Sequence, residues 1–126
     1  MLVTDKRKAL YSFNAGAEAA LARIVGEKGY FAYRDLWRKT SSHEIELDFP
    51  LQLDFELNTG CNLNCPMCPG GLKNPAQKMQ LMDFNMYRGI IDEGVACGAK
   101  AVNFNFINEP LLRKDIGVFV DYARKK

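Results

Sequence analysis

The chain has 126 residues, of which 48% are apolar and 25% charged, and its net charge is +2 at pH 7. This length suffices for one small domain, and the near balance of charges provides no basic stripe of the kind that binds nucleic acid. The sequence contains no run of 18 apolar residues that would span a membrane, and residues 1–8 lack the apolar stretch of a secretory signal. We therefore expect a cytoplasmic protein without nucleic-acid or membrane partners.

The first part of the chain has a helical pattern. Apolar residues recur at steps of three and four on one face of a predicted helix: Leu10, Phe13, Ala17, Leu21 and Ile24. This helix should end near Gly26 to Gly29, and a second short helix should carry Tyr33, Leu36 and Trp37. A polar link over 38–44 has no periodicity, and Pro50 then opens a stretch of different composition. We predict a helical N-terminal region over 1–49 and a second region over 50–126.

Two segments of the second region alternate apolar and polar residues, which favours strands. The apolar positions are Leu51, Leu53, Phe55 and Leu57 in the first segment, and Val102, Phe104 and Phe106 in the second. The polar positions on the other face are Gln52, Asp54, Glu56, Asn103 and Asn105. We expect these polar residues to line a concave interior wide enough for a cofactor and substrate, where each could contact a ligand or simply be solvated. The alternative is an antiparallel sheet with one solvated face.

Two further helices are predicted in this region. Asp83 should cap the N-terminus of the first, and Gly98 should end it. Its buried face consists of Tyr87, Ile90, Ile91, Gly94 and Val95. The last helix places Ile116, Phe119, Val120 and Ala123 on one face. The order strand, helix, strand predicts parallel pairing with a right-handed crossover.

Three of the four cysteines, Cys61, Cys65 and Cys68, fall within eight residues after the first predicted strand. Thiolates are the soft ligands of iron–sulfur clusters, and this run is too short to supply two zinc-binding cysteine pairs. Three thiolates can hold three corners of a cubic cluster and leave the fourth iron open. The alternatives are an electron-transfer cluster or a zinc site completed by His43 or Cys97. We interpret His43 as solvated and Cys97 as a small buried apolar residue.

The cysteine run lies in a loop of about 25 residues, which is long for a connection between a strand and a helix. Glu109 also follows a predicted strand end, and the carboxyl ends of parallel strands share one edge of a sheet, where catalytic residues gather. We therefore expect the cysteines and Glu109 on the same rim. We interpret Gly70-Gly71 as a turn that folds the loop back over a cluster. A phosphate-binding loop is less favoured, because the glycines are not followed by the Lys-Ser/Thr pair and the helix start of a P-loop.

The run Cys61-Asn62-Leu63-Asn64-Cys65-Pro66-Met67-Cys68 resembles the signature of the radical S-adenosylmethionine superfamily. About forty residues on, the segment Asn108-Glu109-Pro110-Leu111-Leu112 resembles its Gly-Gly-Glu-Pro motif. The resemblance covers residues 50–125. It departs at Met67, which is often aromatic in the family, and at Ile107-Asn108, where the family has two glycines. Methionine keeps a polarisable apolar surface for the adenine, and asparagine accepts a positive φ angle more readily than most residues.

The resemblance implies an α/β fold, the first two β/α units of a partial (β/α)6 TIM-like barrel. It also implies a 4Fe-4S cluster on Cys61, Cys65 and Cys68, whose open iron chelates S-adenosylmethionine. The residues that would contact this cofactor are Met67, Asn108, Glu109 and Pro110, with Glu109 accepting a hydrogen bond from its amino group. One electron from an external donor such as flavodoxin or ferredoxin would then produce methionine and a 5′-deoxyadenosyl radical that takes hydrogen from a substrate.

The expected barrel is incomplete, because only two strand–helix units are present in this chain. We expect either a truncated enzyme or a barrel completed by a second chain, since a parallel sheet would otherwise keep an open edge. The substrate class is open between a peptide and a small molecule. The alternative function is a non-catalytic iron–sulfur or zinc module or scaffold, and the alternative role of Glu109 is to cap a turn before Pro110.

Overall fold

The computed structural model describes residues 16, 18–68 and 78–126 and divides the chain into two compact units, Met1–Glu46 and Leu47–Lys126. The division lies three residues before the predicted boundary at 49/50. The predictions for Leu10, Phe13, Ala17 and Gly70-Gly71 fall outside the described residues. Within the described ranges, no helix combines the length and the apolar character needed to cross a membrane.

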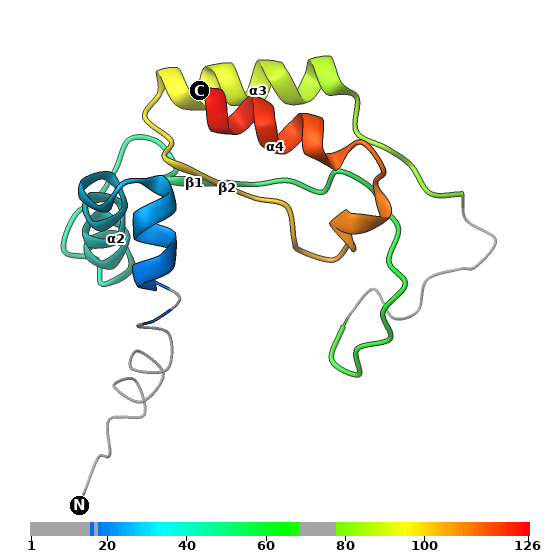
Figure 1. The fold of residues 1–126 in the computed structure, drawn as a ribbon, viewed down its shortest axis with the longest axis horizontal. Helices are drawn as coiled ribbons and strands as arrows, with labels where there is room; N and C mark the ends of the chain where they lie inside the picture. Colours follow the sequence, from blue (N-terminus) through cyan, green and yellow to red (C-terminus); the bar gives the residue numbers. More distant parts are fainter. Residues whose placement is uncertain (1–15, 17, 69–77) are drawn as a thin grey trace, which may run out of the picture. The chain divides into compact units, whose positions relative to one another are not determined.

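In the described part of the first unit, helical residues 18–25 are followed by α2 (Glu27–Ser41) (Figure 1). Gly26, with a φ angle of 101°, separates the two helices, as the sequence predicts. On the predicted apolar face, Leu21 and Ile24 are exposed, whereas the neighbouring Ala22 is buried. The predicted link is also wrong in its first half, since α2 continues through Arg38 to Ser41.

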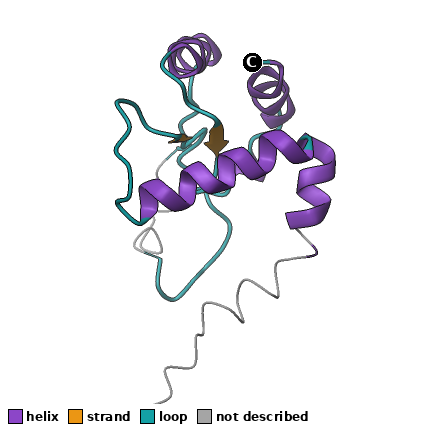
Figure 2. Cartoon of the chain, turned by 90° about the vertical axis from the view of Figure 1, so that its left-hand side faces the viewer, coloured by secondary structure: helices purple, strands orange, loops and turns teal. Residues whose placement is uncertain are grey.

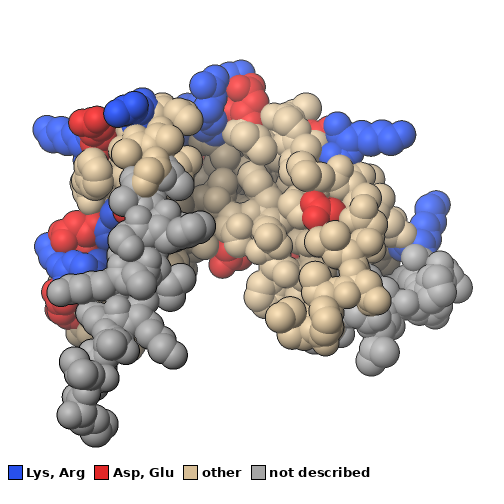
Figure 3. Space-filling model, turned by 60° about the horizontal axis from the view of Figure 1, so that its bottom comes forward, with Lys and Arg blue, Asp and Glu red and all other residues tan. Residues whose placement is uncertain are grey.

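Exposed side chains of α2 form ion pairs with one another and with Glu44, just beyond the end of the helix. Asp35 binds Arg38 at 3.2 Å and Lys39 at 2.6 Å, and Arg38 also binds Glu44 at 2.9 Å. The hydrogen bonds from Lys39 and Arg38 lower the pKa of Asp35. Figure 3 shows such acidic and basic groups as neighbouring red and blue surfaces. Because these pairs are solvated, each contributes little to stability.

The second unit contains a two-stranded parallel sheet of β1 (Gln52–Asp54) and β2 (Ala101–Asn103), drawn in orange in Figure 2. Gln52 pairs with Ala101 and Asp54 with Asn103, so the predicted parallel pairing is confirmed. Both strands are shorter than the alternation predicts. The second ends early because the Asn103 side chain donates to Asn105 O (2.8 Å) and accepts from Asn105 N (3.3 Å), which replaces pairing across the sheet with local bonds.

Two helices, α3 (Phe84–Ala96) and α4 (Ile116–Lys125), cover the same face of this sheet (Figure 1). Asp83 caps α3 as predicted, because its Oδ1 accepts from Asn85 N (2.9 Å) and Met86 N (3.0 Å). Gly98 ends the helix with a φ angle of 102°, also as predicted. A Cβ on Gly94 would lie 2.6 Å from Leu53 Cδ1, so this glycine lets α3 approach β1 closely.

An aromatic core fills the space between the helices and the sheet. Its buried members are Phe55, Leu57, Tyr87, Ile91 and Phe119. The rings of Phe55 and Tyr87 meet edge to face at 4.8 Å, and those of Tyr87 and Phe119 lie 4.9 Å apart. Tyr87 OH donates to Phe119 O (2.9 Å), and burial raises the pKa of this phenol to about 12.

The alternation predicted for the first strand segment correctly identifies which residues are buried: Phe55 and Leu57 are buried, while Asp54 and Glu56 are exposed. The pattern of the second strand is wrong at its end, where Phe106 is 72% exposed. The buried face of α3 is confirmed at Tyr87, Ile91 and Gly94. The flanking residues Ile90, Val95 and, on α4, Val120 are exposed.

Candidate functional site

The loop that carries the cysteines begins and ends at a short antiparallel pairing, which we call the loop neck (residues 57–59 and 80–82). Met82 N donates to Leu57 O and Thr59 N donates to Gln80 O, each at 3.0 Å, around a bridge between Asn58 and Leu81. The Thr59 hydroxyl accepts from Gln80 N at 3.0 Å. The neck therefore joins the end of the β1 segment to the start of α3.

The three cysteines of the loop are free thiols, and Cys61 and Cys68 are half-buried while Cys65 is exposed. Cys68 N donates to Cys65 O (3.0 Å), so Cys65-Pro66-Met67-Cys68 forms a turn that brings its two cysteines near one another. The Met67 side chain is 85% exposed. In the described ranges no three Cys, His, Asp or Glu side chains converge on a metal-binding centre. The thiols thus share a loop without sharing a common centre.

The segment around Glu109 is joined to the start of the cysteine loop. Glu109 N donates to Gly60 O at 2.8 Å, directly before Cys61. The Asn58 side chain completes the junction, because its Nδ2 donates to Glu109 O (3.1 Å) and its Oδ1 accepts from Gly60 N (2.7 Å). The structure therefore brings the two segments singled out in the sequence together through their backbones.

The carboxylate of Glu109 serves as a cap. Its Oε1 accepts from Leu111 N (3.0 Å) at the start of the short 3-10 helix η2 (Pro110–Leu112). This is the capping role that the sequence left as an alternative. Among the described residues no donor reaches the other carboxylate oxygen, so one acceptor remains for a ligand.

Asn108 is only 5% exposed, and the backbone amide of Phe106 donates to its Oδ1 at 3.3 Å. Its Nδ2 is buried without a hydrogen-bond partner among the described residues. An unpaired buried donor costs on the order of 1–3 kcal/mol, so this amide suits an acceptor from a ligand. Asn108 does not adopt the positive φ angle that asparagine tolerates: among described residues other than glycine this angle occurs at His43, with 58°. The Ile107 amide instead donates to Glu56 Oε1 (2.9 Å), which fixes the backbone before Asn108.

The polar residues of the strands bond to one another or to the nearby backbone. Gln52 Nε2 donates to Asp54 Oδ1 (3.0 Å), and Asn103 and Asn105 form the local bonds described above. Together with the contact from Glu56 to the Ile107 amide, these bonds occupy groups that we expected to face a ligand cavity.

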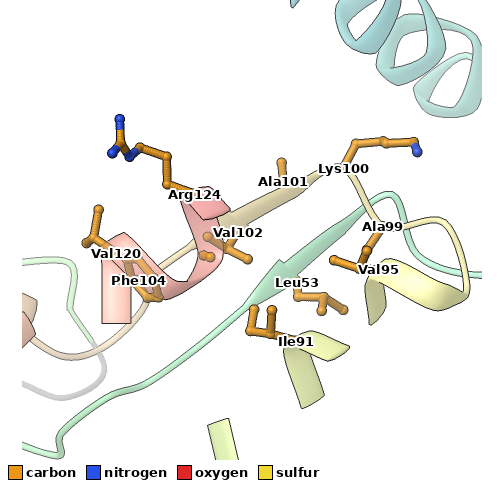
Figure 4. Close-up of a pocket in the computed structure, with 11 residues that line it drawn as sticks. Leu53, Ile91, Val95, Ala99, Lys100, Ala101, Val102, Phe104, Val120 and Arg124 are labelled. Carbon is orange, nitrogen blue, oxygen red and sulfur yellow. The ribbon is translucent and has the colours of Figure 1, made fainter. Parts of the chain in front are cut away.

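An apolar hollow of about 280 Å³ lies between α3, α4 and the sheet (Figure 4). Leu53, Ile91, Val95 and Val102 line it, while the charged ends of Lys100 and Arg124 point away from it. None of the predicted cofactor or metal ligands borders this hollow, so it is separate from the candidate site.

Sequence reasoning did not identify Arg113, whose side chain is only 6% exposed. Its Nη1 donates to Leu57 O and Met82 O, both at 2.7 Å, and thus holds both sides of the loop neck. The rest of the guanidinium forms a two-pronged contact with Asp115 (2.8 and 3.1 Å), which lowers the pKa of that carboxyl. The guanidinium carbon lies 3.9 Å from the ring centre of Phe119. The sequence signal was weak: an arginine two residues from an aspartate before a helix is usually solvated.

Two side chains considered as a fourth ligand lie in exposed turns. His43 is exposed beyond the end of α2, in agreement with its interpretation as solvated. Cys97 is exposed as well, so its interpretation as a buried apolar residue is wrong. The reason is that Cys97 occupies the C-cap of α3, where its amide donates to Glu93 O (2.9 Å) and its side chain turns outward.

Comparison of the chain with protein-family models, with curated proteins and with solved structures finds no match. The family resemblance therefore depends on the two short motifs themselves and on the contacts between them.

Proposed function

We propose that the chain is a radical S-adenosylmethionine enzyme, or the N-terminal part of one, with a 4Fe-4S cluster on Cys61, Cys65 and Cys68. The observation that carries this proposal is the 2.8 Å hydrogen bond from Glu109 N to Gly60 O. It joins the residue before the first cysteine to the segment that resembles the cofactor-binding motif. Two motifs assigned to one cofactor are thus neighbours in space.

The chemical groups at this junction suit the proposed cofactors. The three free thiols are soft ligands of the kind that hold iron–sulfur clusters. Asn108 contributes an unpaired amide donor, and Glu109 keeps one carboxylate oxygen without a donor among the described residues. S-adenosylmethionine presents a carboxylate and an amino group, which complement this donor and this acceptor.

When bound, the cluster supplies the electron that cleaves S-adenosylmethionine to methionine and a hydrogen-abstracting adenosyl radical. The chain itself binds and orients. The thiols lose their protons on ligation, and the turn from Cys65 to Cys68 keeps two of them close. Glu109 accepts a hydrogen bond from the amino group, Pro110 restricts the backbone beside it, and Met67 offers an exposed apolar surface to the adenine.

The proposed architecture is the first two β/α units of a partial (β/α)6 barrel. It is supported by the parallel pairing of β1 and β2 and by the position of α3 and α4 on one face of the sheet. The proposed partners are a peptide or small-molecule substrate, a flavodoxin or ferredoxin as electron donor, and a second chain or further chain segments that complete the barrel.

Anaerobic reconstitution with iron and sulfide tests the cluster. We expect about four iron atoms per chain in the parent, together with the visible absorption of an iron–sulfur chromophore. Cys65→Ala should lose most of this iron, whereas Cys97→Ala, which removes an exposed cysteine outside the loop, should retain it. Equal iron in the parent and Cys65→Ala, or zinc in chains purified without oxygen, would overturn the proposal.

Activity separates the enzyme from a non-catalytic cluster module. The reduced, reconstituted chain should release 5′-deoxyadenosine from S-adenosylmethionine, and Glu109→Gln should release less because its side chain has lost the charge that attracts the amino group. Full iron content without any 5′-deoxyadenosine would instead support the non-catalytic module.

A further inference from the structure

Asn58 is a fully buried polar residue that the proposed chemistry does not itself use. Its relative exposure is 1%, although it directly precedes the exposed part of the cysteine loop. Buried asparagine is uncommon unless its amide is satisfied, because an unpaired amide loses its hydrogen bonds with water. The position of Asn58 therefore calls for a specific pair of partners.

Both ends of the Asn58 amide have a partner, and the partners belong to different segments. The oxygen accepts from Gly60 N at 2.7 Å, within the cysteine loop. The nitrogen donates to Glu109 O at 3.1 Å, 51 residues further along the chain. Since one partner is a donor and the other an acceptor, only one orientation of the amide satisfies both.

The backbone of Asn58 is itself held in place. It pairs with Leu81 in the loop neck, and Arg113 donates to the carbonyl oxygens of Leu57 and Met82 on the two sides of that pairing. The backbone from which the Asn58 side chain projects is thus anchored on both sides of the neck, and we expect a change in the amide to break its hydrogen bonds.

We propose that Asn58 is the positioning residue that keeps the cysteine loop and the Glu109 segment in register. By holding Gly60 N and Glu109 O on one amide, it sets where Cys61 begins relative to the Glu109 carboxylate. The structural role of Asn58 does not depend on the proposed function. Its consequence does rest on that function: the residues that bind the cluster and those that bind S-adenosylmethionine keep a fixed separation.

The first test uses the parent chain without any cofactor. Gly60 N and Glu109 N both belong to the junction, since the first donates to Asn58 Oδ1 and the second to Gly60 O. Their amide hydrogens should therefore open together, with protection factors that agree within about threefold as conditions change. Protection of one amide without the other would overturn the proposal.

The second test is Asn58→Asp, again in the chain without a cofactor. Aspartate has the shape of asparagine and keeps the acceptor for Gly60 N, but it turns an oxygen toward Glu109 O. We expect exchange of the Glu109 amide to accelerate about tenfold and alkylation of half-buried Cys61 to accelerate relative to exposed Cys97. Tyr87→Phe is the matched control, because it removes a buried hydrogen bond elsewhere in the same unit and should change neither ratio.

If Asn58→Asp does not fold, Asn58→Ser replaces it, since a serine hydroxyl can serve Gly60 N but cannot reach Glu109 O. Unchanged exchange and alkylation in a folded variant would refute the role of Asn58, whatever the cluster result.

After reconstitution, the variant should retain its iron but lose the change that S-adenosylmethionine causes in the electron paramagnetic resonance spectrum of the reduced parent. A parent that binds no iron would refute the proposed function and leave the exchange result standing.

Discussion

The aromatic core and the cysteine loop of the second unit are held by different forces. In the core, Phe55, Tyr87 and Phe119 are buried and touch one another on several sides. In the loop, Cys65 and Met67 are exposed, and the observed bonds lie at the neck, at the Asn58 junction and in one turn. Apolar packing thus maintains the scaffold, while a small number of polar contacts positions the loop.

Because of this difference, mutations can change the stability of the scaffold and the ligand binding of the candidate site independently. The free energy of burial that stabilises the core does not depend on the thiols. Cys65 is exposed, while Cys61 and Cys68 are half-buried and lie outside the aromatic core. We therefore expect mutations in the core to change stability, and mutations in the loop to change ligand binding.

Phe119→Ala should have the largest effect on stability. It leaves a cavity among Tyr87, Phe84 and Arg113 and removes the ring beneath the guanidinium. We expect a loss of about 4 kcal/mol in the free energy of unfolding, measured by urea denaturation. Val118→Ala, at an exposed neighbouring position on the same helix, is the control and should cost below about 0.5 kcal/mol.

Arg113→Met should rank second. The change keeps an apolar stem of similar length but removes the guanidinium donor from the carbonyls of Leu57 and Met82, so that Leu57 O keeps only the Met82 amide. We expect a loss of about 3 kcal/mol in the same denaturation measurement, together with faster amide exchange in the loop neck. A loss as small as that of Asp115→Asn, which alters only the exposed partner, would show that the neck does not need its donor.

Alkaline pH should weaken the core through Tyr87. Its pKa of about 12 in the folded chain exceeds its ordinary value of 10, so the folded state holds this proton more tightly. The stabilisation is complete below pH 10 and is lost as pH rises through 12, at a cost of up to about 3 kcal/mol. The difference in unfolding free energy between the parent and Tyr87→Phe isolates this effect. A difference that stays constant from pH 8 to pH 12 would contradict it.

Cys65→Ser should have the smallest effect on stability and a large effect on the cluster. The exposed thiol contributes little to packing, so the chain without a cofactor should lose less than about 0.5 kcal/mol in thermal or urea unfolding. Iron content after reconstitution should nevertheless fall sharply, because serine is a harder and poorer ligand for iron–sulfur clusters. Parallel loss of stability and iron would mean that the loop supports the scaffold.

Local patterns in the sequence predicted the elements of the second unit well. The period of two placed Phe55 and Leu57 on the buried face, and Asp83 and Gly98 marked the ends of α3 because capping and positive φ are local properties. The lengths of the strands were wrong, since the side chain of Asn103 competes with pairing in a way that alternation does not reveal.

The sequence indicated the candidate site residues and the proximity of their two segments, but not the side-chain hydrogen bonds that hold these segments together. The cysteine spacing and the Asn108-Glu109-Pro110 segment are visible in the sequence, and their proximity follows from strand ends that share an edge. The roles of Asn58 and Arg113 depend on partners about 50 residues away, and such pairing has no periodic signature. The outward position of Cys97 likewise depends on how the helix ends.

The loop neck also has a kinetic consequence. The sheet pairs residues about 50 positions apart, so the chain must close a large ring before β1 and β2 can meet, whereas α3 can form from local bonds. Closure entropy grows only slowly with length, by about 0.6 kcal/mol for each doubling. Because the neck closes the cysteine-bearing stretch separately, insertions or deletions within it should leave the folding rate of the unit almost unchanged, which frees that stretch to diversify.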